Sequence, residues 1–189
     1  MLKTKIAVFV SGGGTNFEAL INAQENGKIP HGEIVLMVSS SRTAYALKRA
    51  ENHGIKSVVC SKKELGSQER FEEEILKNLE ENDIQLIVLA GFMSILSKEF
   101  TKKYENRIIN IHPSLIPSFC GEGFYGLHVH EAALKKGVKV TGATVHIVNE
   151  IPDGGPIIMQ RAVYVEENDT PEILQKRVME QAEWKILPE

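Results

Sequence analysis

The chain has 189 residues, of which 42% are hydrophobic and 25% are charged. This composition is typical of a globular protein that buries a core, and it argues against a disordered chain. The formal net charge of −3 gives no electrostatic reason to expect nucleic acid or an anionic membrane as a partner. An anionic ligand would therefore have to be held by local hydrogen-bond donors.

The N-terminal apolar run is too short for a secretion signal and leads directly into a glycine turn. No stretch approaches the roughly 18 apolar residues of a membrane span. The two cysteines, Cys60 and Cys120, predict neither a disulfide framework nor a metal site, and a free thiol is favoured over a nucleophile at Cys120. We expect a soluble cytoplasmic protein, either a monomer or a weak homodimer, that acts on small molecules.

Short apolar runs alternate with amphipathic stretches in the first half of the chain. Apolar residues at three- and four-residue intervals predict helices, whereas short continuous runs predict strands that are buried on both faces. This order predicts an α/β fold with a doubly wound, mostly parallel sheet of the Rossmann-like type. The expected strands are residues 6–10, 33–38, 56–59 and 84–90, and the expected helices are 16–26, 44–52 and 68–82.

The second half of the chain has a different pattern. A strand over 107–112 ends at Pro113, and a proline- and glycine-rich loop follows as far as Gly126. A short helix over 130–136 precedes two strands, 140–148 and 156–165, and Thr170 and Pro171 predict the start of a last helix. We expect an antiparallel C-terminal extension of the sheet and, since no linker or repeat is evident, a single domain over residues 1–189.

The glycine turn Ser11–Asn16 lies between the first strand and the first helix. Glycines at this place let backbone N–H groups approach a ligand, and the N-terminus of a helix favours negative charge. Thr15 and Asn16 add side-chain hydrogen bonds. The dinucleotide pattern fails because Phe17 stands where its third glycine would be. A single phosphate is the favoured ligand, and a tight turn without a ligand stays open.

Three polar residues suggest acyl-transfer chemistry. Asn110 and His112 are two apart, so they share one face of a strand end, and Asp153 lies in a later loop rich in turn residues. An amide stabilises a developing oxyanion, and a carboxylate beside an imidazole manages protons. A structural histidine and a simple turn aspartate remain alternatives for the two single residues. The other histidines form no recognisable metal-ligand set; they include His128, His130 and His146.

Residues 110–117, Asn-Ile-His-Pro-Ser-Leu-Ile-Pro, resemble the signature of the folate-dependent formyltransferases, as do residues 137–146 and 153–158. The glycine turn and residues 90–97 are similar to the branch of that family that formylates glycinamide ribonucleotide. The resemblance covers nearly the whole chain. It implies the formyltransferase fold and transfer of the formyl group of 10-formyltetrahydrofolate to the amine of glycinamide ribonucleotide in purine biosynthesis, without a metal.

The resemblance also implies residue roles. Asn110 would hold the formyl oxygen, His112 would act as general acid, and Asp153 would keep the histidine protonated and relay a proton through water. His146 would support the site. The implied ribonucleotide contacts are Gly14, Thr15, Asn16 and Glu183, and the implied folate contacts are Met93, Ser94, Ile95, Leu96, Asn110, Asn149, Glu150 and Arg70.

Some features depart from the family pattern. Gln68 stands where some members place a folate-contacting arginine, and Arg70 is the nearby substitute. The loop 120–126 is longer than usual, and the family usually continues for a few residues after Pro188, so we expect a clipped C-terminus. The alternatives are a hydrolase that uses water as acceptor and a binding module without activity; a transfer-RNA-formylating relative would be expected to add a further domain.

Overall fold

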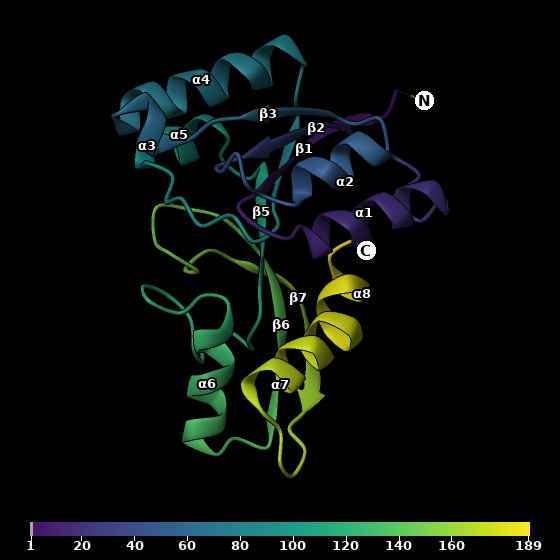
Figure 1. Cartoon of the computed structure of the whole chain (residues 1–189), viewed down its shortest axis with the longest axis vertical. Coiled ribbons are helices and arrows are strands. Elements are labelled where there is room, and N and C mark those ends of the chain that lie inside the picture. The colour runs from purple at the N-terminus through teal and green to yellow at the C-terminus, as the bar shows by residue number, and fades with distance from the viewer. Residues whose placement is uncertain (1) are drawn as a thin grey trace. The chain divides into compact units, whose positions relative to one another are not determined.

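A computed structural model describes residues 2–189 (Figure 1). Within these residues, seven strands form one sheet in the order β3-β2-β1-β4-β5-β6-β7. The expected α/β class, with a mostly parallel sheet and antiparallel C-terminal strands, is confirmed. The chain's contacts divide it into a first unit that ends at Ile109 and a second unit, Asn110–Glu189. A single domain over 1–189 stays a prediction.

The first unit is the parallel part of the sheet. Strand β1 pairs in parallel with β2 and with β4, and β2 pairs in parallel with β3. Helices α1 and α2 lie on one side of these strands and α4 on the other (Figure 1). The elements are β1 (Thr4–Val10), α1 (Thr15–Glu25), β2 (Gly32–Ser39), α2 (Ala46–Asn52), β3 (Lys56–Val59), α3 (Lys62–Leu65), α4 (Gln68–Glu81), β4 (Leu86–Leu89) and α5 (Lys98–Lys103).

Burial on both faces explains the continuous apolar runs of these strands. Residues Ala7, Val8 and Phe9 of β1 are fully buried although successive side chains point to opposite faces. Three apolar residues of α4, each four positions from the next, are also fully buried: Phe71, Ile75 and Leu79. The apolar stripe predicted from their spacing is therefore the buried face of this helix. The packed helices thus fix the strands, including the ends of β1 and β4, after which the glycine turn Ser11–Asn16 and residues 90–97 follow.

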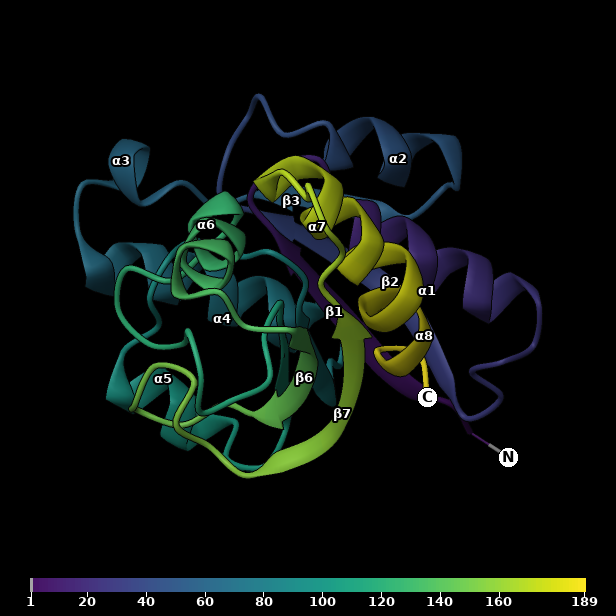
Figure 2. The ribbon, with the colours of Figure 1, turned by 90° about the horizontal axis from the view of Figure 1, so that it is seen from below.

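The second unit contains the antiparallel part of the sheet. β6 pairs antiparallel with β7, from Val140 opposite Tyr164 to His146 opposite Ile157. Helices α7 and α8 lie beside this strand pair (Figure 2). Thr170 caps α7, because its Oγ1 accepts from Ile173 N at 3.3 Å. Strand β5 (Ile108–His112) begins at the end of the first unit and continues into the second. The other elements of the second unit are α6 (Leu127–Lys136), β6 (Val140–Ile147), β7 (Ile157–Tyr164), α7 (Pro171–Val178), a π-helical turn (Met179–Glu183) and α8 (Trp184–Ile186).

Three elements were not predicted from the sequence. The helices α3 and α5 have four and six residues, which is too short for an apolar period to be recognised. Ser97 is the one local signal for α5, since its side chain accepts from Phe100 N at 3.1 Å. The π-helical turn has no sequence signature. None of the helices within residues 2–189 has both the length and the apolar character required to cross a membrane.

Candidate active site

The second unit brings Asn110, His112 and Asp153 into contact. Asn110 and His112 lie on one face of β5, and Asp153 lies in the loop between β6 and β7 with a φ of 54°. His112 Nδ1 is 3.4 Å from Asp153 Oδ2, and Asn110 Nδ2 donates to Asp153 Oδ1 at 3.4 Å. Tertiary structure therefore joins a strand end to a distant turn, which the spacing of these residues in the sequence could not establish.

The proline- and glycine-rich loop after β5 contributes backbone groups to this cluster. Gly121 N donates to Asp153 Oδ2 at 2.8 Å, and His112 Nε2 donates to the Phe119 carbonyl at 2.8 Å. A carbonyl oxygen only accepts, so the hydrogen of a neutral His112 is on Nε2. The unprotonated Nδ1 then faces the carboxylate of Asp153. A proton between His112 Nδ1 and the Asp153 carboxylate would be shared by the two groups.

His146 orients the amide of Asn110. His146 Nδ1 donates to the Ile147 carbonyl at 2.8 Å, which leaves Nε2 as an acceptor in the neutral ring. Asn110 Nδ2 lies 3.0 Å from this Nε2 and donates one of its two hydrogens there. Its second hydrogen points to Asp153 over a longer 3.4 Å contact. That second N–H is the donor that a substrate oxygen can engage most readily, and the supporting role implied for His146 agrees with this contact.

Burial and charge act in opposite directions on the two titrating groups. Burial lowers the pKa of His112, and the charge of Asp153 opposes it without fully compensating. Burial would raise the pKa of Asp153, but the His146 ring, whose Nε2 lies 3.4 Å from Oδ1, the charge of His112 and the Gly121 N–H hold it below its usual value. The Asp153 carboxylate thus favours protonation of His112, which is the direction that the resemblance implies. Burial has the larger effect, so without substrate the His112 ring is shifted toward its neutral form.

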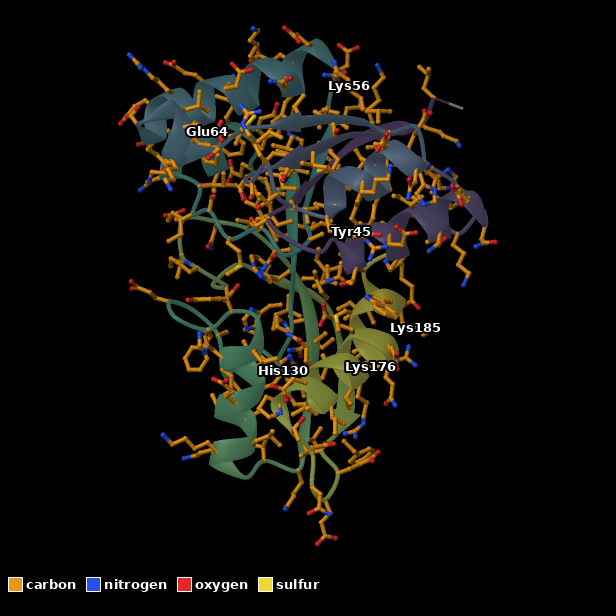
Figure 3. All side chains as sticks on the ribbon, viewed as in Figure 1. Tyr45, Lys56, Glu64, His130, Lys176 and Lys185 are labelled. Carbon is orange, nitrogen blue, oxygen red and sulfur yellow. The ribbon has the colours of Figure 1, made fainter. Side chains whose placement is uncertain are left out.

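His130 is a second buried imidazole in this unit. It is fully buried on the side of α6 turned toward β6 and α7 (Figure 3). Neither of its ring nitrogens has a hydrogen-bond partner in the part of the chain that the structure describes. Burial, with a smaller contribution from the charge of His112, lowers the pKa of His130 to about 4. This ring is neutral at physiological pH.

Two further kinds of reactive group are metal-ligating side chains and thiols. Among residues 2–189, no group of three or more His, Cys, Asp or Glu side chains is placed to hold a metal ion. Cys120 is a free thiol whose Sγ donates to the Pro117 carbonyl at 3.3 Å. Burial raises the pKa of Cys120, and raises that of Cys60 to about 11, so both favour the thiol over the nucleophilic thiolate.

The glycine turn of the first unit has a defined geometry. Gly14 precedes α1 with a φ of 72°, a conformation that glycine adopts without strain, and Thr15 and Asn16 begin the helix. Arg49 of α2 donates from Nε to the Gly13 carbonyl at 2.9 Å. The turn is thus fixed by its neighbour helix. The acidic residue expected to contact the same ligand, Glu183, is buried in the π-helical turn of the other unit.

The residues expected to bind folate also fall in both units. Met93 and Ile95 have exposed side chains, 52% and 73%, while Ser94 and Leu96 between and beside them are half-buried. Gln68 Nε2 donates to the Ile95 carbonyl at 3.1 Å, whereas the Arg70 side chain is exposed on α4. The remaining two expected contacts lie in the loop before Asp153 of the second unit; they are Asn149, half-buried, and Glu150, exposed.

Known proteins share this fold. A model described as formyl transferase matches residues 4–189, and the chain belongs to this family. The chain is 38% identical over 184 residues to phosphoribosylglycinamide formyltransferase of Haemophilus influenzae, covering 97% of this chain and 84% of that protein. It is also similar to the crystal structure of phosphoribosylglycinamide formyltransferase from Bacillus halodurans, with 40% identity and a TM-score of 0.90 over 98% of this chain and 92% of that one.

A longer relative matches as well. The chain is 47% identical over 186 residues to the trifunctional purine biosynthetic protein adenosine-3 of Gallus gallus. This match covers 98% of the chain but only 18% of the chicken protein. The chain thus spans a small part of that relative's length.

Proposed function

We propose that the chain transfers the formyl group of 10-formyltetrahydrofolate to the amine of glycinamide ribonucleotide. The products are formylglycinamide ribonucleotide and tetrahydrofolate, in a step of de novo purine biosynthesis. The observation that carries the proposal is the contact of Asn110, His112 and Asp153 in one partly buried cluster, in a chain of this family whose relatives bear the name of that activity.

Asn110 stabilises the oxyanion in the proposed reaction. The amine of the ribonucleotide attacks the formyl carbon, and negative charge develops on the formyl oxygen. The Asn110 N–H that forms only the long contact to Asp153 turns to this oxygen, while its other N–H stays on His146. A donor aimed at developing charge in a water-poor site lowers the barrier more than it tightens substrate binding.

His112 and Asp153 handle protons in the same reaction. The attacking amine loses a proton as the new C–N bond forms, and N10 of the folate gains one as its bond to the formyl carbon breaks. His112 Nδ1 is unprotonated in the neutral ring and faces a carboxylate, so this pair can accept the first proton. The imidazolium that results is stabilised by Asp153 and is the general acid for the second transfer.

The two substrates are assigned to the residues named from the resemblance. Gly14, Thr15 and Asn16 would bind the phosphate of the ribonucleotide, supported by the helix N-terminus and by the fixed Gly14 turn. Glu183 would also contact the ribonucleotide. The folate would contact Asn110 and the residues Met93, Ser94, Ile95, Leu96, Asn149, Glu150 and Arg70, the last of which is exposed on α4.

We further propose a cytoplasmic protein that is a monomer or a weak homodimer, with a single domain over 1–189. The two free thiols, Cys60 and Cys120, are compatible with a reducing compartment. Analytical ultracentrifugation over a range of protein concentrations measures the oligomeric state. A stable dimer or higher oligomer at the lowest concentration would contradict the monomeric or weakly dimeric form.

The test is a transfer assay with purified protein. The protein is incubated with 10-formyltetrahydrofolate, or its dideaza analogue, with and without glycinamide ribonucleotide, and release of the deformylated folate is followed by absorbance. We expect release that requires the ribonucleotide and is lost in Asp153→Asn. Release without the ribonucleotide would indicate a hydrolase, and tight ligand binding without any release would indicate a binding protein.

A further inference from the structure

The loop Gly91–Ser97, which follows β4 in the first unit, is held in place at several points while two of its apolar side chains stay exposed. Phe92 packs its ring against Phe9 and Phe71, with centroids 5.1 and 6.4 Å away. Met93 N donates to Ser11 Oγ at 2.7 Å. The exposed side chains are those of Met93 and Ile95, at 52% and 73%. A fixed loop that shows apolar side chains to solvent is typical of a ligand surface rather than of a mobile connection.

The other end of this loop is held by a buried carboxylate of α4. Glu72 is only 8% exposed, and its two oxygens accept three hydrogen bonds. Oε1 accepts from Gln68 Nε2 at 2.5 Å and from Ser97 N at 2.6 Å, and Oε2 accepts from Ser97 Oγ at 2.6 Å. Gln68 donates in addition to the Ile95 carbonyl at 3.1 Å. We call Gln68, Glu72 and Ser97 the loop bracket.

We propose that the loop bracket positions the folate-binding loop, and that Gln68 and Glu72 are positioning residues that set the affinity for the folate substrate. This inference rests on the proposed function, which assigns Met93–Leu96 to the folate. Gln68 and Glu72 of the loop bracket form hydrogen bonds to the Ile95 carbonyl and to Ser97. The loop is therefore fixed with the side chains of Met93 and Ile95 exposed, and these form an apolar surface. A flat aromatic ring that binds such a surface does not have to order the loop first.

The hydrogen bonds of the loop bracket require a carboxylate at position 72 and an amide at position 68. A buried carboxylate needs donors on its oxygens, and Gln68 and Ser97 supply them. In Gln68→Glu, a nearly isosteric change, a second carboxylate would face Glu72 without a donor between them. In Glu72→Gln, the amide oxygen can still accept from Gln68 and Ser97 N, but these bonds are no longer charge-assisted, and the Ser97 hydroxyl must accept instead of donate. Gln68→Glu should therefore release the Ile95 carbonyl, and Glu72→Gln should weaken the hold on Ser97.

The test measures affinity for both substrates separately. Binding of a dideaza folate analogue and of glycinamide ribonucleotide is measured by titration calorimetry, and the KM of each substrate and kcat are measured in the transfer assay. We expect Gln68→Glu to raise the Kd and KM for the folate about tenfold and Glu72→Gln to raise them less, with the ribonucleotide values changed less than about twofold in both. Ser97→Ala, which removes one donor and one helix cap, should give a smaller loss in the same direction.

A double variant and a control variant make the result specific. Gln68→Glu combined with Glu72→Gln again places one carboxylate beside one amide but leaves the Ile95 carbonyl without its donor, so we expect it to recover only part of the folate affinity that Gln68→Glu loses. Glu73→Gln removes an exposed charge from the next position of α4 and should change neither affinity. Folate affinity that is unchanged in folded single variants, or lost equally for both substrates, overturns the inference. A wild-type protein that binds neither substrate would instead contradict the proposed function.

Discussion

His112 Nδ1 lies 3.4 Å from Asp153 Oδ2, with 5% and 14% of the two side chains exposed. The histidine ends a strand and the aspartate lies in a loop between two later strands, so this contact depends on the whole second unit. Because the histidine Nε2–H is directed at the Phe119 carbonyl, only Nδ1 remains for proton exchange with the carboxylate.

The first prediction concerns Asp153→Asn. Burial lowers the pKa of His112 and Asp153 raises it, so removing the carboxylate should move the pKa of His112 still lower. The titration of the His112 ring protons, followed by NMR, measures this shift. We expect kcat to fall by at least about 10²-fold, because proton transfer loses its acceptor pair. Glu122→Gln, an exposed acid in the neighbouring loop, is the control, and a raised His112 midpoint in Asp153→Asn would refute the arrangement.

The second prediction concerns Asn110→Ala. This change removes the proposed oxyanion donor, and loss of one such donor costs about 10² to 10³ in kcat. We expect the Kd of the folate analogue to change much less than kcat, since the donor acts mainly on the transition state. Steady-state kinetics and calorimetry measure the two effects. An equal loss in binding and in kcat/KM, with kcat preserved, would show that Asn110 only holds the substrate.

The third prediction compares Gly14→Ala with Gly13→Ala. Gly14 has a φ of 72°, and a Cβ there would lie 2.8 Å from the Ala46 Cβ, whereas a Cβ at Gly13 meets nothing within 4 Å. Gly14→Ala should lower the free energy of unfolding by about 1 to 3 kcal/mol and weaken ribonucleotide binding. Gly13→Ala should be nearly neutral for stability. Denaturant unfolding measures both, and equal effects of the two changes would contradict the geometry.

The fourth prediction concerns the ion pairs of His53 in the first unit. Hydrogen bonds to Glu25 and Glu18 raise the pKa of His53 above its ordinary value of 6.5. The stabilisation is fully present below that unfolded value and is lost as the pH rises through the folded pKa. His53→Gln should therefore destabilise the protein at about pH 5.5 more than at about pH 9. Urea unfolding at the two pH values measures the difference, and a larger effect at high pH would have the wrong sign.

The fifth prediction concerns buried His130. Its pKa is lowered from 6.5 to about 4, so the unfolded chain binds a proton that the folded chain excludes. Stability should fall as the pH drops from about 6.5 toward 4, by up to roughly 3 kcal/mol for this group. His130→Leu should show a flatter pH dependence over this range. Parallel urea titrations of the wild-type protein and the variant measure the slope, and identical slopes would show that His130 titrates normally.

The sequence predicted the elements whose residues carry a clear period. Strand 56–59 has the bounds of β3, and the stripe of Phe71, Ile75 and Leu79 is buried as the spacing indicates. The short helices α3 and α5 were missed because four to six residues contain too little of a period. The loop bracket was missed for a different reason. A glutamate on a charged helix looks like a solvent-exposed residue until the loop that covers it is known.

The fold class, the family and the residue types that the chemistry needs can be predicted from the sequence. Apolar period, glycine and proline placement, and the motif around Asn110 and His112 are local, and local patterns are readable along a chain. Three features required the folded chain: the contact of Asp153 with His112, the contact of His146 with Asn110, and the excess of burial over the carboxylate charge in the pKa of His112. Contacts and desolvation depend on atoms far apart in sequence, and no spacing encodes the distance between them.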